Sequence, residues 1–316
     1  MCRSIEDYPR HLAEFDARFG TEAACRDYLV SLRWPAGFRC PRCGHGKAWA
    51  VRRVLFECAR CGVQTSVLAG TVLQDTRQPL RQWFRAMWWV TAPKTGMSAL
   101  SLQRVLGLGS YKTAWSWLHK LRRAMVRPGR DRLTGRVEVD ETFLGAPVMR
   151  RVGPPRSNKV LIGVAVEEDR DGIGRIRMRR LVDASTASLR PFVDEAVERG
   201  SVVHTDGWVG YDFLKRRGYR HEISFLHGNT ASPSELLPRV HRVISLLKRW
   251  LLGTHQGAIT PEHLDYYLNE FTFRFNRRRS QSRGKLFYRL VQQAVATGPA
   301  PYRSLIRISG APNRKM

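Results

Sequence analysis

Four cysteines crowded into a short segment constrain the fold of this chain more than any other feature. Cys40 and Cys43 form one C-x₂-C pair, and Cys58 and Cys61 form a second pair after fourteen intervening residues. Two such pairs form tight turns that each present two thiolates to one tetrahedral Zn²⁺ ion. Because four sulfurs leave no open position, the predicted zinc is structural and stabilises a ribbon too small to fold alone. Four buried thiols without a metal are the alternative, and we expect His45 to be a bystander.

The charge of the chain points to nucleic acid. Its 316 residues include 54 Lys and Arg against 27 Asp and Glu, a formal net charge of +27. A field of this strength attracts polyanions, and nucleic acid is the most common of them. The charge is uneven, because residues 1–30 hold four basic and six acidic side chains, whereas residues 271–316 hold eleven basic and no acidic ones. An enzyme acting on a small neutral metabolite has no use for such a field.

Several other classes of protein are excluded. The longest apolar run, at residues 160–166, has the length of a strand and not the ~20 residues of a membrane span. Glu6 and Asp7 stand where a signal peptide has its apolar segment, which argues against export. Six cysteines are too few for a disulfide framework in a chain of this length. We therefore expect a protein of an intracellular, reducing compartment that does not enter a membrane.

The texture of the sequence divides the chain into five parts. We predict a helical lead-in (1–35), a zinc ribbon (36–76), a helix-turn-helix domain (77–128), an α/β domain (136–280) and a basic, weakly patterned C-terminal tail (281–316). A Gly- and Pro-containing linker rich in arginine separates the helix-turn-helix from the α/β domain. No internal repeat or low-complexity tract interrupts this order.

The helix-turn-helix is predicted from two helical patterns joined by a glycine turn. Ser98 begins a short helix, residues 107–109 break it, and Ser110 begins a longer amphipathic helix. A short helix, a tight turn and a longer recognition helix are typical of DNA-binding domains. A helical hairpin with a solvated basic face is the alternative. The outward face of the second helix, which we expect to contact DNA, offers Lys112, Thr113, Ser116, Lys120 and Arg123.

The α/β domain is predicted from alternating patterns. Strands are expected at residues 136–143, 159–166, 175–181, 201–205 and 220–225, and helices at 189–198, 240–252 and 261–277. A further helix is expected between the last two strands, so the order is three strands, helix, strand, helix, strand, helix, which predicts a mixed α/β layer fold. A basic loop at 146–158 interrupts the first hairpin. We expect its Arg150 and Arg151 to hold flanking or target DNA.

Two aspartates of this domain are placed to bind catalytic metal. Asp140 lies at the end of the first strand, and Asp206 ends another short strand just before a glycine. Two carboxylates at the ends of neighbouring strands can share divalent cations that activate a nucleophile and stabilise the leaving oxygen of a phosphodiester. A third ligand is expected from the helix that follows the last strand. There His241 and Lys248 lie on the margin of the apolar stripe, Lys248 suiting a phosphate contact. Capping by the aspartates, packing of His241 and solvation of Lys248 are the alternatives.

These motifs together resemble the bacterial insertion-sequence transposases of the DDE superfamily. The resemblance is to the group with an N-terminal zinc ribbon and an RNase H-like catalytic domain. It runs through nearly the whole chain: the cysteine ribbon, Ala69-Gly-Thr, Pro79-Leu80, Ser110-Tyr-Lys-Thr-Ala-Trp, Val139-Asp-Glu-Thr, His204-Thr-Asp-Gly and Lys248-Arg-Trp-Leu-Leu-Gly-Thr-His, ending in a segment that starts at Glu270. It implies that Asp140 and Asp206 are the first two catalytic acids and that His241 takes the third position, with Lys248 seven residues later. Glu270, Arg274 and Arg277 match the closing motif of the family, and we expect both arginines to contact DNA.

The third position departs from the glutamate usual in the superfamily. A neutral imidazole binds Mg²⁺ less readily than a carboxylate does and binds Mn²⁺ somewhat better. Either His241 binds the catalytic Mg²⁺ or Mn²⁺ weakly, or another acid assists, the candidates being Glu235 and Glu270. Glu270 shares a helix face with Arg274 and Arg277, so pairing with an arginine is the alternative for it.

The sequence thus predicts a DNA transposase that cuts transposon ends by metal-dependent hydrolysis and joins them to target DNA. Its partners would be terminal inverted repeats, target DNA and at least one further copy of itself, in the bacterial cytoplasm at the nucleoid. Two alternatives remain: a zinc-ribbon, helix-turn-helix regulator with an inactive α/β half, and a stand-alone RNase H-like nuclease.

Overall fold

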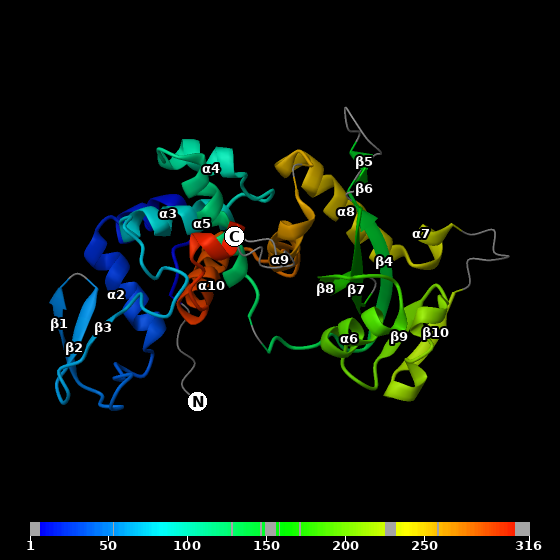
Figure 1. The fold of residues 1–316 in the computed structure, drawn as a ribbon, viewed down its shortest axis with the longest axis horizontal. Coiled ribbons are helices and arrows are strands. Elements are labelled where there is room, and N and C mark those ends of the chain that lie inside the picture. Colours follow the sequence, from blue (N-terminus) through cyan, green and yellow to red (C-terminus); the bar gives the residue numbers. More distant parts are fainter. Residues whose placement is uncertain are drawn as a thin grey trace, which may run out of the picture. The chain divides into compact units, whose positions relative to one another are not determined.

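The computed structural model of the chain describes residues 7–52, 54–127, 129–145, 147–148, 156–157, 159–170, 172–224, 232–257 and 259–306. The chain divides into two compact units (Figure 1). Unit 1 comprises Met1–Pro128 together with Arg279–Met316, and unit 2 comprises Gly129–Arg278. The first unit therefore takes up both ends of the chain, and the second is inserted between them.

Unit 1 is mainly helical and also contains a small sheet. Its helices are α1 (Leu12–Arg18), α2 (Glu22–Arg33), α3 (Leu80–Thr91), α4 (Ala99–Leu106), α5 (Tyr111–Ala124), α10 (Arg283–Ala296) and α11 (Tyr302–Ile306). As predicted, α4 and α5 begin at serines: Ser98 and Ser110 each accept a hydrogen bond from a backbone N–H of the first turn. Gly107 ends α4 at a φ of 63°, a left-handed conformation that glycine adopts without strain. The two helices contact each other, so the helix–turn–helix connection is present.

The zinc-ribbon segment supplies the sheet of unit 1. Strands β1 (Ala48–Arg52), β2 (Leu55–Cys58) and β3 (Gln64–Ser66) pair antiparallel in the order β1-β2-β3. The ribbon strands end at Ser66, before the predicted boundary at residue 76. The following residues Val67, Val72 and Leu73 are fully buried, and the backbone N–H of Val72 donates to Ala294 in α10.

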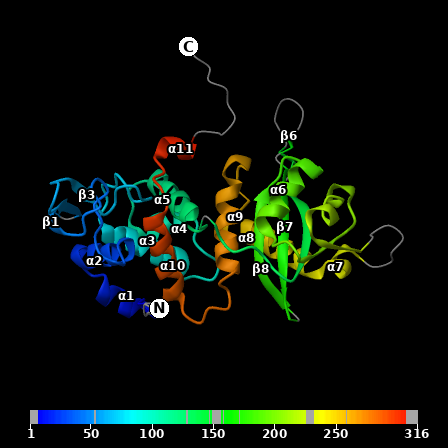
Figure 2. The same ribbon diagram turned by 90° about the horizontal axis from the view of Figure 1, so that it is seen from below.

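The C-terminal segment differs from the predicted tail. α10 packs against α2, α3 and α5, so residues 283–296 belong to the core of unit 1 (Figure 2). Phe287 is completely buried at the centre of an aromatic cluster. Its ring centroid lies 5.3 Å from that of Phe15, 5.5 Å from that of Phe19 and 5.9 Å from that of Trp88. This helix was not predicted, because basic residues separate its apolar positions. Its apolar side chains pack against helices that are distant in the sequence.

Unit 2 is built on a five-stranded mixed sheet. The strands are β4 (Arg136–Leu144), β7 (Val160–Asp169), β8 (Gly172–Arg180), β9 (Val202–Thr205) and β10 (Arg220–Ile223), in the order β10-β9-β4-β7-β8. β7 is antiparallel to both β4 and β8, whereas β4, β9 and β10 run parallel. The short strands β5 (Pro147–Val148) and β6 (Arg156–Ser157) pair within the connection between β4 and β7.

Helices cover both faces of this sheet. α6 (Thr186–Ala196) packs with Val139, Ala165 and Val203 on one face. On the other face, α8 (Pro238–His255) and α9 (Leu264–Phe275) bury Ile162, Val164 and Ile176. α7 (Pro233–Leu236) precedes α8, and the short 3₁₀ helix η3 (Pro261–His263) precedes α9.

The resulting mixed sheet with helices on both faces confirms the predicted RNase H-like α/β fold. One part of the predicted order is wrong. Between β9 and β10 there is no α-helix in the described chain, only the 3₁₀ helices η1 (Val209–Tyr211) and η2 (Lys215–Arg217).

The burial of Phe287 predicts that unit 1 depends on its C-terminal helix. Phe287→Ala removes the ring at the centre of the aromatic cluster and should lower the free energy of unfolding of unit 1 by about 3–5 kcal/mol. Urea denaturation measures this loss. Leu100→Ala on the exposed side of α4 is the control and should change stability by no more than about 0.5 kcal/mol. Equal effects of the two substitutions would contradict a structural role for α10.

Candidate active site and metal centre

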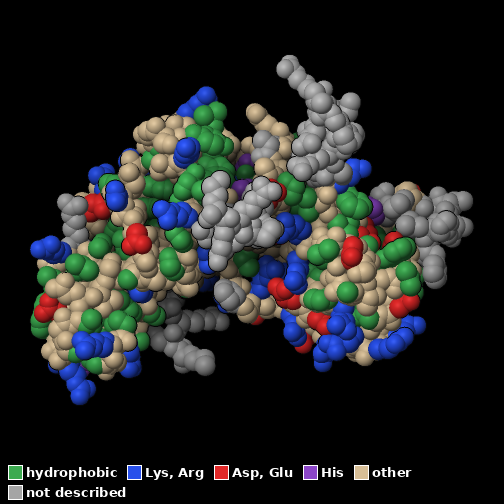
Figure 3. All heavy atoms as spheres, in the orientation of Figure 1, with side chains coloured by type: hydrophobic (Ala, Val, Ile, Leu, Met, Phe, Trp, Pro, Cys, Tyr) green, Lys and Arg blue, Asp and Glu red, His purple; other side chains and the backbone are tan. Residues whose placement is uncertain are grey.

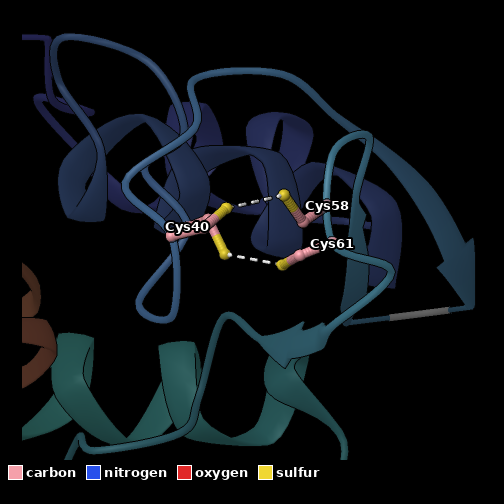
Figure 4. A group of neighbouring side chains, drawn as sticks. Cys40, Cys58 and Cys61 are labelled. Carbon is pink, nitrogen blue, oxygen red and sulfur yellow. Dashed lines mark hydrogen bonds between the residues drawn. The ribbon is translucent and has the colours of Figure 1, made fainter.

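The four cysteines of the ribbon converge on one point (Figure 4). The Sγ atoms of Cys40 and Cys61 are 3.6 Å apart, as are those of Cys43 and Cys58. A Zn²⁺ ion with four bonds of about 2.3 Å would hold its sulfurs about 3.8 Å apart. Of the described His, Cys, Asp and Glu side chains, only these four form a group of three or more with all ligand atoms within 4.8 Å of one another. The geometry fits the predicted structural zinc.

Two matching turns deliver these sulfurs. Gly44 donates its N–H to the carbonyl of Cys40, and Gly62 donates to the carbonyl of Cys58. Both glycines have a left-handed φ, 71° and 66°, which a side chain would strain. His45 takes part through its carbonyl oxygen, which accepts the N–H of Cys40, and its side chain lies outside the cysteine group.

Asp140 and His241 meet between the sheet and α8. His241 Nε2 lies 3.6 Å from Asp140 Oδ2, and the two side chains are 30% and 14% exposed. One cation with bonds of about 2.1 Å can bridge donor atoms up to about 4.2 Å apart, so this pair fits a shared metal ion. Burial, reinforced by the negative charges of Asp206 and Glu138, raises the pKa of Asp140 to about 6. Burial also lowers the pKa of His241, which favours the neutral imidazole that a metal requires.

Asp206 directly follows the last residue of β9, next to the middle of β4, where Asp140 lies and not at the strand end as predicted. The parallel pairing of β4 with β9 ends at Glu138 opposite His204, and two further residues along each strand bring Asp140 level with Asp206. Gly207 follows at a φ of 84° and turns the chain sharply. One carboxylate oxygen of Asp206 accepts the N–H of Trp208 at 3.0 Å. The negative charge of Asp206 thus raises the pKa of Asp140. Among the described residues, the two aspartates do not belong to a ligand group as compact as that of the four cysteines.

Lys248 lies two turns after His241 on the same helix. Its Nζ donates to Thr142 Oγ1 at 3.2 Å, and its side chain is exposed. Thr142 is two residues beyond Asp140 and therefore on the same face of β4. Along the contact between α8 and β4, His241 therefore lies beside Asp140, and Lys248 lies beside Thr142.

Glu138, which the sequence analysis did not single out, holds α8 in this position. Its side chain is only 1% exposed. One carboxylate oxygen accepts the backbone N–H of Val240 at 2.7 Å, and the other accepts from Arg239 at 3.1 Å. A carboxylate at the first turn of a helix pairs with unsatisfied N–H groups and with the positive end of the helix dipole. Glu138 lies two residues before Asp140 on β4, and Val240 directly precedes His241 on α8. The hydrogen bond between Glu138 and Val240 therefore places His241 near Asp140. Its place on the Asp140 face of the strand was the available signal.

Glu141 forms a second unpredicted link. Tyr211 is completely buried, and its hydroxyl donates to Glu141 Oε2 at 2.6 Å. Burial and the charges of Asp140 and Asp206 raise the pKa of Glu141 to about 7. Because Tyr211 follows Asp206 by five residues, this bond ties the loop of one aspartate to the strand of the other.

Comparison with known families supports both parts of the chain. Residues 132–276 match the ISXO2-like transposase domain, and residues 20–64 match the transposase zinc-ribbon domain. The chain belongs to the insertion-sequence transposases with an N-terminal zinc ribbon. It is a DNA transposase, and its two matched domains imply an enzyme that binds DNA. No curated protein is significantly similar to it. No helix in the described parts of this transposase is long and apolar enough to span a membrane.

Two residues of the closing motif pair with each other on α9. Glu270 is fully buried on α9, and one of its oxygens accepts from Arg274 Nε at 2.8 Å. Arg274 is only 9% exposed within this pair, and its contact with DNA stays a prediction. Arg277 lies over the ring of Phe273, 4.1 Å from its centroid, and donates to the Phe273 carbonyl. The proposed assistance to His241 finds no geometric support: Glu270 forms the ion pair just described, and Glu235 is exposed and accepts from Ser232.

The predicted DNA-contacting residues of α5 divide into two sets. Lys112 and Arg123 are exposed and Thr113 is partly exposed. Ser116 is 9% exposed, so its predicted outward orientation is wrong. Lys120 is half-buried with its ammonium 6.0 Å from the centroid of Trp83. Elsewhere, Lys and Arg side chains are spread over the visible face of each unit (Figure 3). Arg150 and Arg151 lie outside the described residues.

Zinc content provides a direct test of the ribbon. Cys58→Ser removes one of four ligands and should reduce bound zinc from about one ion per chain to a small fraction, because the remaining three sulfurs leave the site open. Metal analysis of the purified protein measures this. Cys25→Ala, at a buried thiol outside the group, should retain full zinc. Loss of zinc from the Cys25 variant alone would contradict the assignment.

Removal of the Glu138 carboxylate should loosen α8. Glu138→Ala leaves the Val240 N–H without its buried partner, at a cost of about 2–3 kcal/mol. Hydrogen–deuterium exchange should therefore become faster in the first turn of α8 and stay unchanged in unit 1. Glu222→Ala is the matched control, because Glu222 also pairs with an arginine of unit 2 but is 45% exposed. Unchanged protection of α8 in Glu138→Ala would refute the anchoring role.

Proposed function

We propose that Asp140, Asp206 and His241 hold divalent cations, Mg²⁺ or Mn²⁺, and that Lys248 binds a phosphate of the DNA. The transposase would hydrolyse a phosphodiester at each transposon end and then join the freed 3′-hydroxyl to target DNA. The observation that carries this proposal is the 3.6 Å approach of His241 to Asp140, with Lys248 beside Thr142 on the same two elements. We assign the reaction to the bacterial cytoplasm, at the nucleoid.

Each residue has a role that follows from its surroundings. Cations bound there would activate the attacking oxygen and stabilise the leaving one. Asp140 on β4 and Asp206 just after β9 concentrate negative charge beside these neighbouring strands, and burial of Asp140 strengthens its interactions. His241 stays neutral and offers a nitrogen lone pair. The exposed ammonium of Lys248 would neutralise a phosphate next to the one that reacts.

The remaining DNA contacts are assigned to unit 1 and to basic surface residues. Lys112, Thr113 and Arg123 of α5 and the zinc ribbon would bind the terminal inverted repeats. Simultaneous handling of two ends requires at least a homodimer. No observation favours the inactive regulator or the stand-alone nuclease. The next experiment distinguishes each of them from a transposase.

Replacement of either aspartate should abolish chemistry and preserve binding. Asp140→Asn and Asp206→Asn each remove a carboxylate charge and should reduce strand cleavage and strand transfer by about 10³-fold or more. Both reactions are measured on labelled DNA carrying the element's ends, with Mg²⁺ or Mn²⁺, alongside end binding. Asp212→Asn removes the same charge from an exposed site nearby and should remain active. Full activity of either site variant would sink the proposal, cleavage without joining would indicate a nuclease, and binding without cleavage by the wild type would indicate a regulator.

His241→Glu tests the third ligand separately. A carboxylate in place of the imidazole should shift the ratio of activities with Mg²⁺ and Mn²⁺ toward Mg²⁺, because Mg²⁺ prefers oxygen ligands. The ratio is obtained from metal titrations of strand cleavage by wild type and variant. An unchanged ratio would show that residue 241 does not bind the metal.

A further inference from the structure

A cavity of about 420 Å³ opens in unit 2 at the end of β4. This volume is within the range of about 300–1,000 Å³ typical of small-molecule sites. The end of β4, the second half of α8 and the segment leading into α9 form its walls. Most of the side chains lining it are apolar, among them Phe143, Leu144, Leu252, Ile259 and Leu264, and Lys248 contributes the charged group.

The cavity continues the line of the proposed active site. Asp140, Thr142 and Leu144 alternate onto one face of β4. α8 places His241 beside Asp140 and Lys248 beside Thr142, and Lys248 also lines the cavity. At about 3.3 Å per residue, Leu144 lies about 13 Å along the strand from Asp140. Since stacked nucleotides rise about 3.4 Å each, the cavity falls within a few nucleotides of the reacting phosphate.

The lining combines exposed apolar side chains, one of them aromatic, with a lysine. Phe143 is 58% exposed and Leu252 is 67% exposed, so water covers large apolar side chains beside a lysine. Among the described residues that line the cavity there is no carboxylate, so none of them repels a phosphate. A DNA strand whose phosphate contacts Lys248 carries its bases to these apolar walls, where an aromatic ring can stack on any base.

We infer that this cavity receives one unstacked nucleobase of the DNA end, held next to the phosphate that Lys248 contacts. The inference rests on the proposed function of the site and adds a base-binding subsite to it. Enzymes that act on nucleic acid often take a base out of the stack into such a pocket. Lys248 would contact the phosphate, which leaves the apolar side chains to contact the base. The subsite would therefore bind bases by stacking and shape, with weak preference among them.

The test uses 2-aminopurine, whose fluorescence rises when it leaves the base stack. End duplexes carry it at each of the four positions on either side of the cleavage point in turn. The full-length protein is added with no Mg²⁺ or Mn²⁺, so that binding is read without chemistry. With the wild type, the fluorescence of 2-aminopurine should rise at one position. Leu252→Glu puts a negative charge at the cavity and should abolish this rise. Val182→Glu adds the same charge at a 94% exposed site of unit 2 and should keep it.

A second measurement ties the base to the aromatic ring. Phe143→Ala should weaken binding of the intact end about tenfold. The same substitution should have no effect on an end that lacks the base at the bright position. Equal weakening of intact and abasic DNA, or the absence of any bright position, would overturn the subsite, as would variants that change only the oligomeric state. Because the signal needs no cleavage, activity of Asp140→Asn would refute the proposed catalytic site and leave this result standing.

Discussion

The contact between the Glu138 carboxylate and the first turn of α8 determines the geometry of the candidate site. α8 carries His241 and Lys248, whereas β4 carries Asp140 and Thr142, and 101 residues separate Glu138 from Arg239 in the chain. Apolar packing along α8 fixes which face meets the sheet but constrains sliding along the helix axis only weakly. A buried hydrogen bond of 2.7 Å to one backbone N–H sets that remaining degree of freedom. The positions of both α8 side chains follow from it.

The shortage of acids makes each buried one informative. With 27 acidic residues against 54 basic ones, basic side chains outnumber carboxylates two to one. Three acids nevertheless fall within four residues of β4, and each has a different environment. Glu138 is satisfied by α8, Glu141 by Tyr211, and Asp140 keeps a raised pKa of about 6. Glu138 and Glu141 hold neighbouring segments in place, but the pKa of Glu141 is also raised, to about 7, so Asp140 and Glu141 share the buried negative charge that a cation would relieve.

The sequence predicted those features that depend on local pattern. The cysteine spacing, the helix starts at Ser98 and Ser110 and most strands of the sheet could be read directly, and the order of elements led to the fold. Features that depend on distant partners could not be. Phe287 looks like one apolar residue in a basic segment, because its ring partners, Phe15, Phe19 and Trp88 among them, are distant in the sequence. The pair that Arg274 forms with Glu270 is local by contrast, because the two residues lie four apart on one helix, and the sequence already offered it as the alternative for Glu270.

The histidine at the third position is less disruptive than its chemistry alone suggests, because of where α8 begins. His241 is the fourth residue of a helix that starts at Pro238. The positive end of a helix dipole disfavours a protonated imidazole, and burial acts in the same direction. The imidazole of His241 is therefore kept neutral, with a nitrogen lone pair available. Glu138 already supplies the negative charge that the dipole attracts at the start of the helix. A carboxylate at position 241 would add a further negative charge beside Asp140, Asp206 and Glu138. The imidazole offers a ligand without that repulsion, at the cost of weaker attraction for Mg²⁺.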